Sequence, residues 1–170
     1  MPFAPIRDGE WVLSTLREAT HSTRWGYLAA AWALVFAALH FYWALGGEAG
    51  LASSAGSELA ATRPLWFVLA GLWGVGSLLV AGACLAIMMT RRHALRSLRW
   101  LVVVAGWAVS LLLLLRGVGL EVLLLGGFYD GNTALTPSQV HVSLVLWNPW
   151  FILGGLAFAM ASLAGTSRSS

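Results

Sequence analysis

Three side chains that can transfer protons or form strong hydrogen bonds lie inside long apolar stretches of the chain: His40, Glu121 and Asn148. A charge at the centre of a membrane helix costs about 2.5–3.5 kcal/mol on insertion scales, so such residues are usually functional. A carboxylic acid such as Glu121 can act as a general acid, and an imidazole such as His40 as a general base. We therefore expect these three residues to form one polar site.

Other residues of suitable type lie close to these three in the sequence. His141 is a second candidate base, and the sequence alone does not choose between it and His40. Arg116 and Asn148 are expected to orient Glu121. The candidate substrate-binding residues are the polar and aromatic side chains Tyr42, Trp43, Arg116, Trp147, Asn148 and Trp150. The indole faces of the tryptophans would stabilise a carbocation by cation–π attraction.

The same residues also have structural interpretations. His40, Tyr42 and Trp43 have the composition of an aromatic belt at the membrane–water interface. Arg116 is long enough to extend toward lipid headgroups. Asn148 could bond to backbone groups left unpaired beside Pro149, because proline lacks an N–H group. The residue types alone leave both interpretations open.

The composition is that of a membrane protein. Of 170 residues, 59% are hydrophobic and 10% are charged, whereas soluble domains contain about 25% charged residues. The formal net charge of +3 is too small for a nucleic-acid-binding surface. The single cysteine, Cys84, excludes an intramolecular disulfide, a CxxC redox pair and a cysteine-based metal site. We expect no metal, no cofactor and no nucleic-acid partner.

Four apolar runs are each long enough to cross the hydrocarbon core of a bilayer, which takes about 20 residues. They cover residues 25–45, 65–89, 100–125 and about 138–163. We predict an all-α fold, an integral membrane four-helix bundle that forms a single domain over residues 1–170. Residues 1–24 are expected to be a cytoplasmic juxtamembrane segment.

The distribution of arginine predicts the orientation. Eight arginines lie in the N-terminal segment, in the loop between the second and third runs, and in the C-terminal tail. The other two loops contain only Arg63. By the positive-inside rule, both termini should be cytoplasmic, and the expected location is the plasma membrane. A cleaved signal peptide is the alternative interpretation of the first run, but its full length and the long preceding segment argue against it.

Small residues and the candidate polar residues share one face on three of the helices, at about 100° per residue. In the first run the face comprises Ala29, Ala33, Ala37 and His40. In the third run it comprises Gly106, Ser110, Gly117 and Glu121, and in the fourth His141, Asn148 and Gly155. Small residues mark faces where membrane helices approach closely. We therefore expect these faces to point into the bundle, with the polar groups together in its outer half.

Local patterns predict where the helices begin and bend. Thr136, Pro137 and Gln139 form a capping-box sequence that should start the fourth helix. Thr62, before Arg63 and a proline, is expected to start the second span in a similar way. Pro149 lies within the fourth run and should kink that helix.

Two stretches resemble motifs of a known family: LHFYWALGG at the end of the first run and LWNPWFILGG in the fourth. The chain resembles, over essentially its whole length, a family of small bacterial four-span membrane proteins whose common domain has no assigned function. This resemblance implies the fold and no particular chemistry. More weakly, the chain looks like small actinobacterial membrane-bound terpene cyclases, which implies a lipophilic isoprenoid substrate.

The favoured hypothesis is an integral-membrane acid–base enzyme, a cyclase or isomerase acting on an isoprenoid-like or sterol-like molecule. An apolar cavity favours the neutral form of a carboxylic acid, so Glu121 would protonate an alkene or epoxide. His40 or His141 would take up the terminal proton. No DDxxD motif is present, so a cyclisation would begin by protonation rather than by metal-assisted loss of diphosphate.

Two other hypotheses remain open. The same polar residues could form part of a carrier, a channel or an accessory subunit, although they occupy only one half of the membrane. The chain could also be a structural membrane protein without a site. The lipid bilayer is the expected partner in each case, a lipophilic small molecule in the first, and a homo-oligomer is compatible with all three.

Overall fold

The computed structural model describes residues 8–91, 98–126 and 136–166, with side chains from residue 23 onward. The described chain is helical, and no strand occurs within it. Its elements are α1 (Asp8–Ala44), α2 (Leu51–Ala55), α3 (Ser57–Thr62), the π-helix η1 (Phe67–Gly74), α4 (Val75–Thr90), α5 (Arg99–Leu125), α6 (Pro137–Val142), the π-helix η3 (Ser143–Trp147) and α7 (Asn148–Thr166).

Four of the helical segments are long and apolar enough to cross a membrane. They are Thr23–Ala44, Phe67–Thr90, Arg99–Leu125 and Pro137–Thr166. The ranges expected from the sequence agree with these segments to within a few residues. The predicted all-α, four-helix membrane bundle is therefore confirmed.

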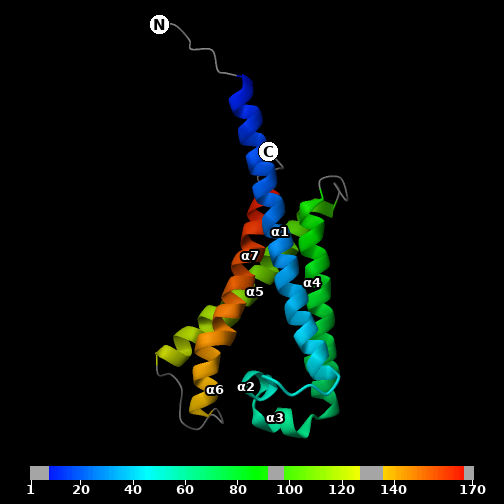
Figure 1. Cartoon of the computed structure of the whole chain (residues 1–170), viewed down its shortest axis with the longest axis vertical. Coiled ribbons are helices and arrows are strands. Elements are labelled where there is room, and N and C mark those ends of the chain that lie inside the picture. The colour runs from blue at the N-terminus through cyan, green and yellow to red at the C-terminus, as the bar shows by residue number, and fades with distance from the viewer. Residues whose placement is uncertain (1–7, 92–97, 127–135, 167–170) are drawn as a thin grey trace.

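The four spans run side by side, and α1 begins at the same end of the bundle at which α7 ends (Figure 1). The short helices α2 and α3 lie at the opposite end, which we call the α2–α3 end (Figure 1). α1 packs mainly on α4 and α7, and α5 packs mainly on α7. α4 and α5 make far fewer contacts with each other, so the bundle is least tightly closed between them.

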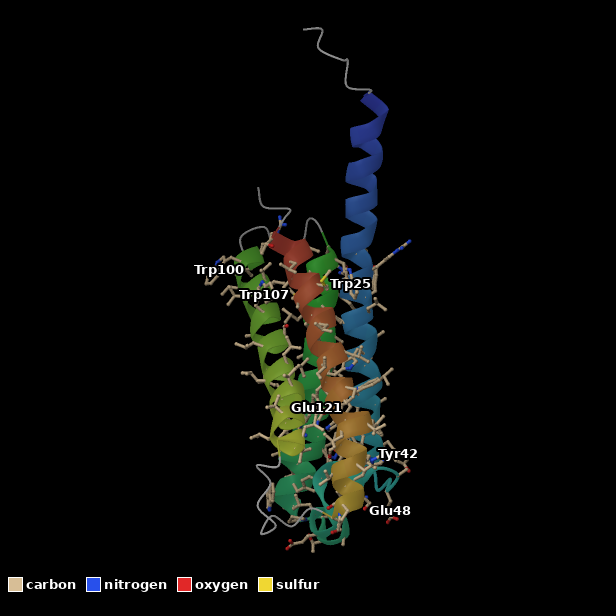
Figure 2. The ribbon with its side chains drawn as sticks, turned by 90° about the vertical axis from the view of Figure 1, so that its left-hand side faces the viewer. Trp25, Tyr42, Glu48, Trp100, Trp107 and Glu121 are labelled. Carbon is tan, nitrogen blue, oxygen red and sulfur yellow. The ribbon has the colours of Figure 1, made fainter. Side chains whose placement is uncertain are left out.

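Aromatic side chains lie toward both ends of the bundle. Trp25, Trp100 and Trp107 are at one end and Tyr42 is at the other (Figure 2). Trp100 and Tyr42 are exposed on the outside of the bundle. Amphipathic rings gather at the two membrane–water interfaces, so this arrangement agrees with a bundle that spans a bilayer.

The start of the fourth span follows its sequence pattern. The Thr136 hydroxyl accepts a hydrogen bond from the Gln139 backbone N–H, and the Gln139 side chain accepts one from the Thr136 N–H. Pro137 occupies the first helical turn. The predicted capping box is confirmed. Before Pro149 the helix widens into η3, and π-helical turns of this kind often accompany bends and functional sites.

The start of the second span differs from the prediction. Thr62 ends α3, and its hydroxyl donates to the carbonyl of Glu58 in its own helix, so the expected N-cap was wrong. Arg63 has a left-handed backbone (φ 43°). Its guanidinium donates to the carbonyls of Trp43 and Gly47 at 2.9 and 2.6 Å. Arg63 thus ties the α2–α3 segment to the C-terminal end of α1.

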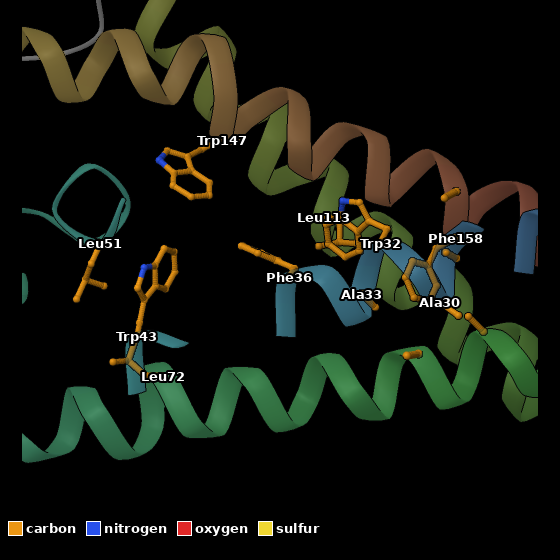
Figure 3. Close-up of a cluster of buried hydrophobic side chains, with 14 of the residues drawn as sticks. Ala30, Trp32, Ala33, Phe36, Trp43, Leu51, Leu72, Leu113, Trp147 and Phe158 are labelled. Atoms are coloured by element: carbon orange, nitrogen blue, oxygen red, sulfur yellow. The ribbon is translucent and has the colours of Figure 1, made fainter. Parts of the chain in front are cut away.

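The core consists of small residues where helices approach and a group of aromatic rings toward the α2–α3 end. Ala29, Ala33 and Ala37 are at most 2% exposed, as the small-residue face of the first helix predicts. Phe36 lies between Trp32 on one side and Trp43 on the other (Figure 3). The α2–α3 segment closes this core, because Leu51 is only 1% exposed.

Candidate functional site

Asn148 joins two charged residues of α5. Its side chain is fully buried. Arg116 Nη1 donates to Asn148 Oδ1 at 3.3 Å, and Asn148 Nδ2 donates to Glu121 Oε2 at 2.7 Å. Arg116 and Glu121 are five residues apart on one helix, a spacing that does not pair side chains well. The amide from α7 therefore bridges them, and Figure 2 shows Glu121 on the side of α5 that faces α7.

Glycine and serine allow α5 and α7 to approach closely at this point. A Cβ atom at Gly117 would lie 3.0 Å from the carbonyl oxygen of Asn148 and 2.8 Å from a side-chain carbon of Ile152. About two helical turns away, Ser110 Oγ donates to the carbonyl of Gly155 at 2.8 Å. The predicted small-residue face of the third helix is thus a packing face, and it brings Asn148 against α5.

His40 is 8% exposed and lies at the α2–α3 end of α1. Its Nδ1 is 2.9 Å from the carbonyl oxygen of Phe36. A carbonyl only accepts hydrogen bonds, so Nδ1 carries a hydrogen and, in the neutral ring, Nε2 holds the free lone pair. The ring packs edge-on against Phe36 and Trp43, with centroid distances of 4.6 and 5.2 Å. These contacts fix the orientation of the imidazole.

A cavity of about 690 Å³ lies among α1, α4, α5 and α7, and we call it the α4–α5 cavity. Most of its lining is apolar, and its polar side chains are His40, Arg116 and Ser54. Leu78 of α4 and Leu112 of α5 also line it, and these are 72% and 66% exposed. The cavity therefore opens sideways between α4 and α5, toward the region that lipid occupies around a membrane bundle.

The guanidinium of Arg116 contacts two residues of α7 at this cavity. Its central carbon lies 4.7 Å from the centroid of the Phe151 ring, which is also part of the lining. Asn148 Oδ1 accepts a hydrogen bond from the guanidinium. Arg116 directly precedes Gly117, so the two residues lie about 100° apart around the helix. That offset is what allows Gly117 to pack on α7 while Arg116 faces the cavity.

The three candidate tryptophans form a wall next to the cavity and are not among its lining residues. Trp43 is 1% exposed, and its indole N–H donates to the Ala49 carbonyl at 2.7 Å. Trp147 and Trp150 lie 6.4 and 6.2 Å from Phe36 between ring centroids. Their indole nitrogens are buried and have no hydrogen-bond partner in the described part of the chain. These rings support the Phe36 and His40 side of the cavity.

Two candidate residues are not brought to the cavity. Tyr42 is 46% exposed on the outer side of α1. His141 is exposed on α6 and is not among the lining residues, whereas Asn148 is fully buried. The seven-residue spacing assumed uniform α-helical turns, but the π-helix η3 lies between His141 and Asn148. Its wider turns rotate the earlier residues out of register.

Some cavity residues were not identified from the sequence. Phe36 lies four residues before His40, so helical spacing alone could have placed both rings on one face. Phe151 follows Asn148 by three residues in the same way. Ser54 could not be identified as a cavity residue from the sequence, because it lies on the short helix α2. No pattern in the sequence of the first loop predicts that helix. In the described residues, no group of three His, Cys, Asp or Glu side chains is placed to hold a metal ion.

The comparisons with known proteins identify a family and no activity. No curated protein and no solved structure matches the chain. One family model, described as a protein of unknown function (DUF3995), matches residues 33–158, which is well over half of the chain. The matched range includes His40, Arg116, Glu121 and Asn148. The chain therefore belongs to the DUF3995 family of proteins of unknown function.

Proposed function

We propose that this protein is an integral-membrane acid–base enzyme, an isomerase or cyclase, that acts on a lipophilic molecule of isoprenoid-like or sterol-like character. One observation carries the proposal. An apolar cavity that opens sideways between two spans contains an imidazole with a free Nε2 and a guanidinium. A purely structural bundle has no need of this combination, because polar groups at membrane depth are unfavourable without a partner or a role.

The dimensions of the cavity suit a small lipid. Binding pockets for small molecules typically measure about 300–1,000 Å³ and are mostly apolar with a few placed polar groups. The α4–α5 cavity, at about 690 Å³, falls within this range. Its side opening would let a substrate dissolved in the bilayer enter between Leu78 and Leu112 without crossing water.

The residues divide into groups that contact the substrate and groups that position them. His40 is the general base, because its Nε2 lone pair is free and its ring lines the cavity. Arg116 contacts the polar group of the substrate. Asn148 and Glu121 position Arg116 through the hydrogen bonds that link them. In this proposal Glu121 is a positioning residue and not the initiating acid, because it is not among the lining residues.

A carrier or channel is less well supported. Such a protein requires polar groups along the whole path across the membrane. His40, Arg116, Glu121 and Asn148 all lie in the half of the bundle nearer to the α2–α3 end. In the described residues, the interior of the other half is formed mainly by small side chains such as Ala29, Ala86 and Gly106.

The proposal is tested by filling the cavity. Val109 lines it and is partly buried, so Val109→Trp would occupy the space of the substrate. The matched control is Val104→Trp on the same helix, where the side chain is 55% exposed and outside the lining. Lipids extracted from detergent-purified protein are identified by mass spectrometry. We expect a specific lipophilic compound with the wild type and with Val104→Trp, and its loss with Val109→Trp. The same lipid profile in all three proteins would contradict the proposal.

A further inference from the structure

The charge in the α4–α5 cavity distinguishes acid–base reactions that pass through a carbocation from those that pass through an anion. Among the described residues that line it, Arg116 is the one with a permanent charge. A guanidinium remains protonated under all ordinary conditions. In an apolar cavity its positive charge acts over a long range, because little water screens it. Glu121, which Asn148 links to Arg116, offsets part of this charge, but it is not among the residues that line the cavity. The charged group that lines the cavity therefore disfavours a carbocation there and favours an anion.

The aromatic rings do not compensate for this charge. The Phe151 face, which could stabilise a carbocation, already holds the guanidinium of Arg116 at 4.7 Å. Phe36 is packed edge-on against His40 and Phe151, with interplanar angles of 83° and 81°. Trp32 and Phe158 also line the cavity, but Trp32 is stacked on Trp150 with 5.8 Å between ring centroids, and Phe158 is only 1% exposed. Trp43, Trp147 and Trp150 lie behind the lining. The cavity is thus better suited to an intermediate that carries negative charge on an oxygen atom.

We infer, on the basis of the proposed function, that the substrate is a lipophilic carbonyl compound and that the reaction moves a proton at the carbon next to the carbonyl group. Arg116 donates hydrogen bonds to the carbonyl oxygen, and His40 Nε2 removes the proton. Asn148 accepts from one N–H group of Nη1. A guanidinium has five N–H groups, so others can donate to the substrate. Cyclisation through a carbocation is not part of this mechanism.

The step balances without a cofactor. The bond between the α-carbon and its hydrogen breaks, and the proton goes to Nε2 of His40. The electron pair forms a double bond to the carbonyl carbon, and the carbonyl π electrons move onto the oxygen as an enolate. The imidazolium is stabilised by the hydrogen bond from Nδ1–H to the Phe36 carbonyl. Returning the proton to the γ-carbon of a β,γ-unsaturated ketone gives the conjugated isomer. In deuterium oxide the proton on Nε2 is replaced by a deuteron from solvent, and transfer of that deuteron to the α-carbon gives isotope exchange.

Exchange provides a test that does not require the natural substrate. The probe is farnesylacetone, an isoprenoid ketone, in detergent micelles made with deuterium oxide. Farnesane, the saturated hydrocarbon with a similar chain, is the comparison ligand. Deuterium at the α-carbons is measured by mass spectrometry, with protein-free micelles as the background. Binding of each ligand is measured by displacement of a fluorescent lipid.

We expect the wild type to bind farnesylacetone at least about tenfold more tightly than farnesane, because a charged donor meets the carbonyl oxygen. It should also accelerate deuterium uptake above the background. His40→Gln should reduce this acceleration about a hundredfold while the ketone still binds. Arg116→Gln should reduce both the preference for the ketone and the exchange, the latter about a hundredfold. Arg116→Lys, which keeps the charge, should retain part of the preference for the ketone and part of the exchange activity.

The outcomes separate this inference from the proposed function. Equal binding of both ligands by the wild type would overturn the carbonyl substrate and leave the cavity as a lipid site. Preference for the ketone without deuterium uptake would overturn the role of His40 as the base. Failure of both ligands to bind would contradict the proposed function itself. The wild-type measurements decide these cases even if a cavity variant does not fold.

Discussion

Asn148 donates from Nδ2 to Oε2 of Glu121 at 2.7 Å, across the interface between α7 and α5. This hydrogen bond fixes the orientation of the amide, because a carboxylate can accept from the amide nitrogen but cannot donate to the amide oxygen. The oxygen of Asn148 must then point toward Arg116. The carboxylate on α5 thus determines which atom of the buried amide meets the guanidinium, although the two charged groups have no direct bond in the described structure.

Removal of the amide should destabilise the bundle. Asn148→Leu keeps approximately the same volume but leaves Glu121 and Arg116 without their common partner. The expected cost is about 1–3 kcal/mol in the free energy of unfolding, since a buried polar group loses its hydrogen bond. Combining Asn148→Leu with Glu121→Leu should recover part of this loss, with a coupling energy of about 0.5–3 kcal/mol. The wild type, the two single variants and the double variant are compared by thermal or denaturant unfolding in detergent. Strictly additive effects of the two substitutions would contradict the hydrogen bond between Asn148 and Glu121.

Two substitutions of Glu121 separate positioning from acid catalysis. Glu121→Gln keeps an oxygen that accepts from Asn148 Nδ2, so the bundle should be as stable as the wild type and most of the exchange activity should remain. Glu121→Leu removes the acceptor and should lower the activity much more. Loss of activity in Glu121→Gln with unchanged stability would show instead that the carboxyl group supplies a proton, as the sequence suggested.

The close approach of α5 and α7 can be tested with two glycines of the same helix. A Cβ at Gly117 would meet Ile152 and the Asn148 backbone, so Gly117→Ala should destabilise the protein by about 1–3 kcal/mol. At Gly119 nothing lies within 4 Å of the added atom, so Gly119→Ala should be neutral or slightly stabilising. Equal unfolding temperatures for the two variants would contradict the packing of the α5–α7 interface.

The orientation in the membrane is a prediction from the arginine distribution. In a Cys84→Ala background, Ser57→Cys places a thiol on α3, and Thr166→Cys places one at the end of α7; both positions are exposed. An impermeant thiol reagent added to intact cells should label the first and not the second, because the α2–α3 end is expected to lie outside. The reverse labelling would place the termini outside.

The spans and their inward faces could be predicted because their causes are local. The length of each apolar run, the capping box at Thr136 and the small residues beside His40 act within one helix, and the structure agrees with each of them. For Asn148 and Glu121, the sequence predicted only that both lie on inward faces of their helices and at a similar depth in the membrane. The hydrogen bonds themselves depend on how α5 and α7 pack.

The remaining features depend on non-local packing or on departures from regular helices. The exposure of His141, seven residues before the buried Asn148, was not expected, because nothing in the sequence fixed the π-helical turns of η3. The role of Arg63 at the end of α1 depends on the folding of α2 and α3 within the first loop. The cavity itself depends on the loose packing between α4 and α5, and no property of either helix alone determines that packing.

The central claim is that a lipophilic carbonyl molecule occupies the α4–α5 cavity, and photolabelling tests it most directly. A farnesylacetone analogue with a diazirine on its chain is irradiated with the purified protein, and the labelled residues are mapped by mass spectrometry. The account predicts labels on lining residues such as Leu78, Leu112 and Phe151, suppressed by an excess of farnesylacetone. Labels spread over outward-facing residues such as Leu123 and Leu153, with no competition by the ketone, would contradict it.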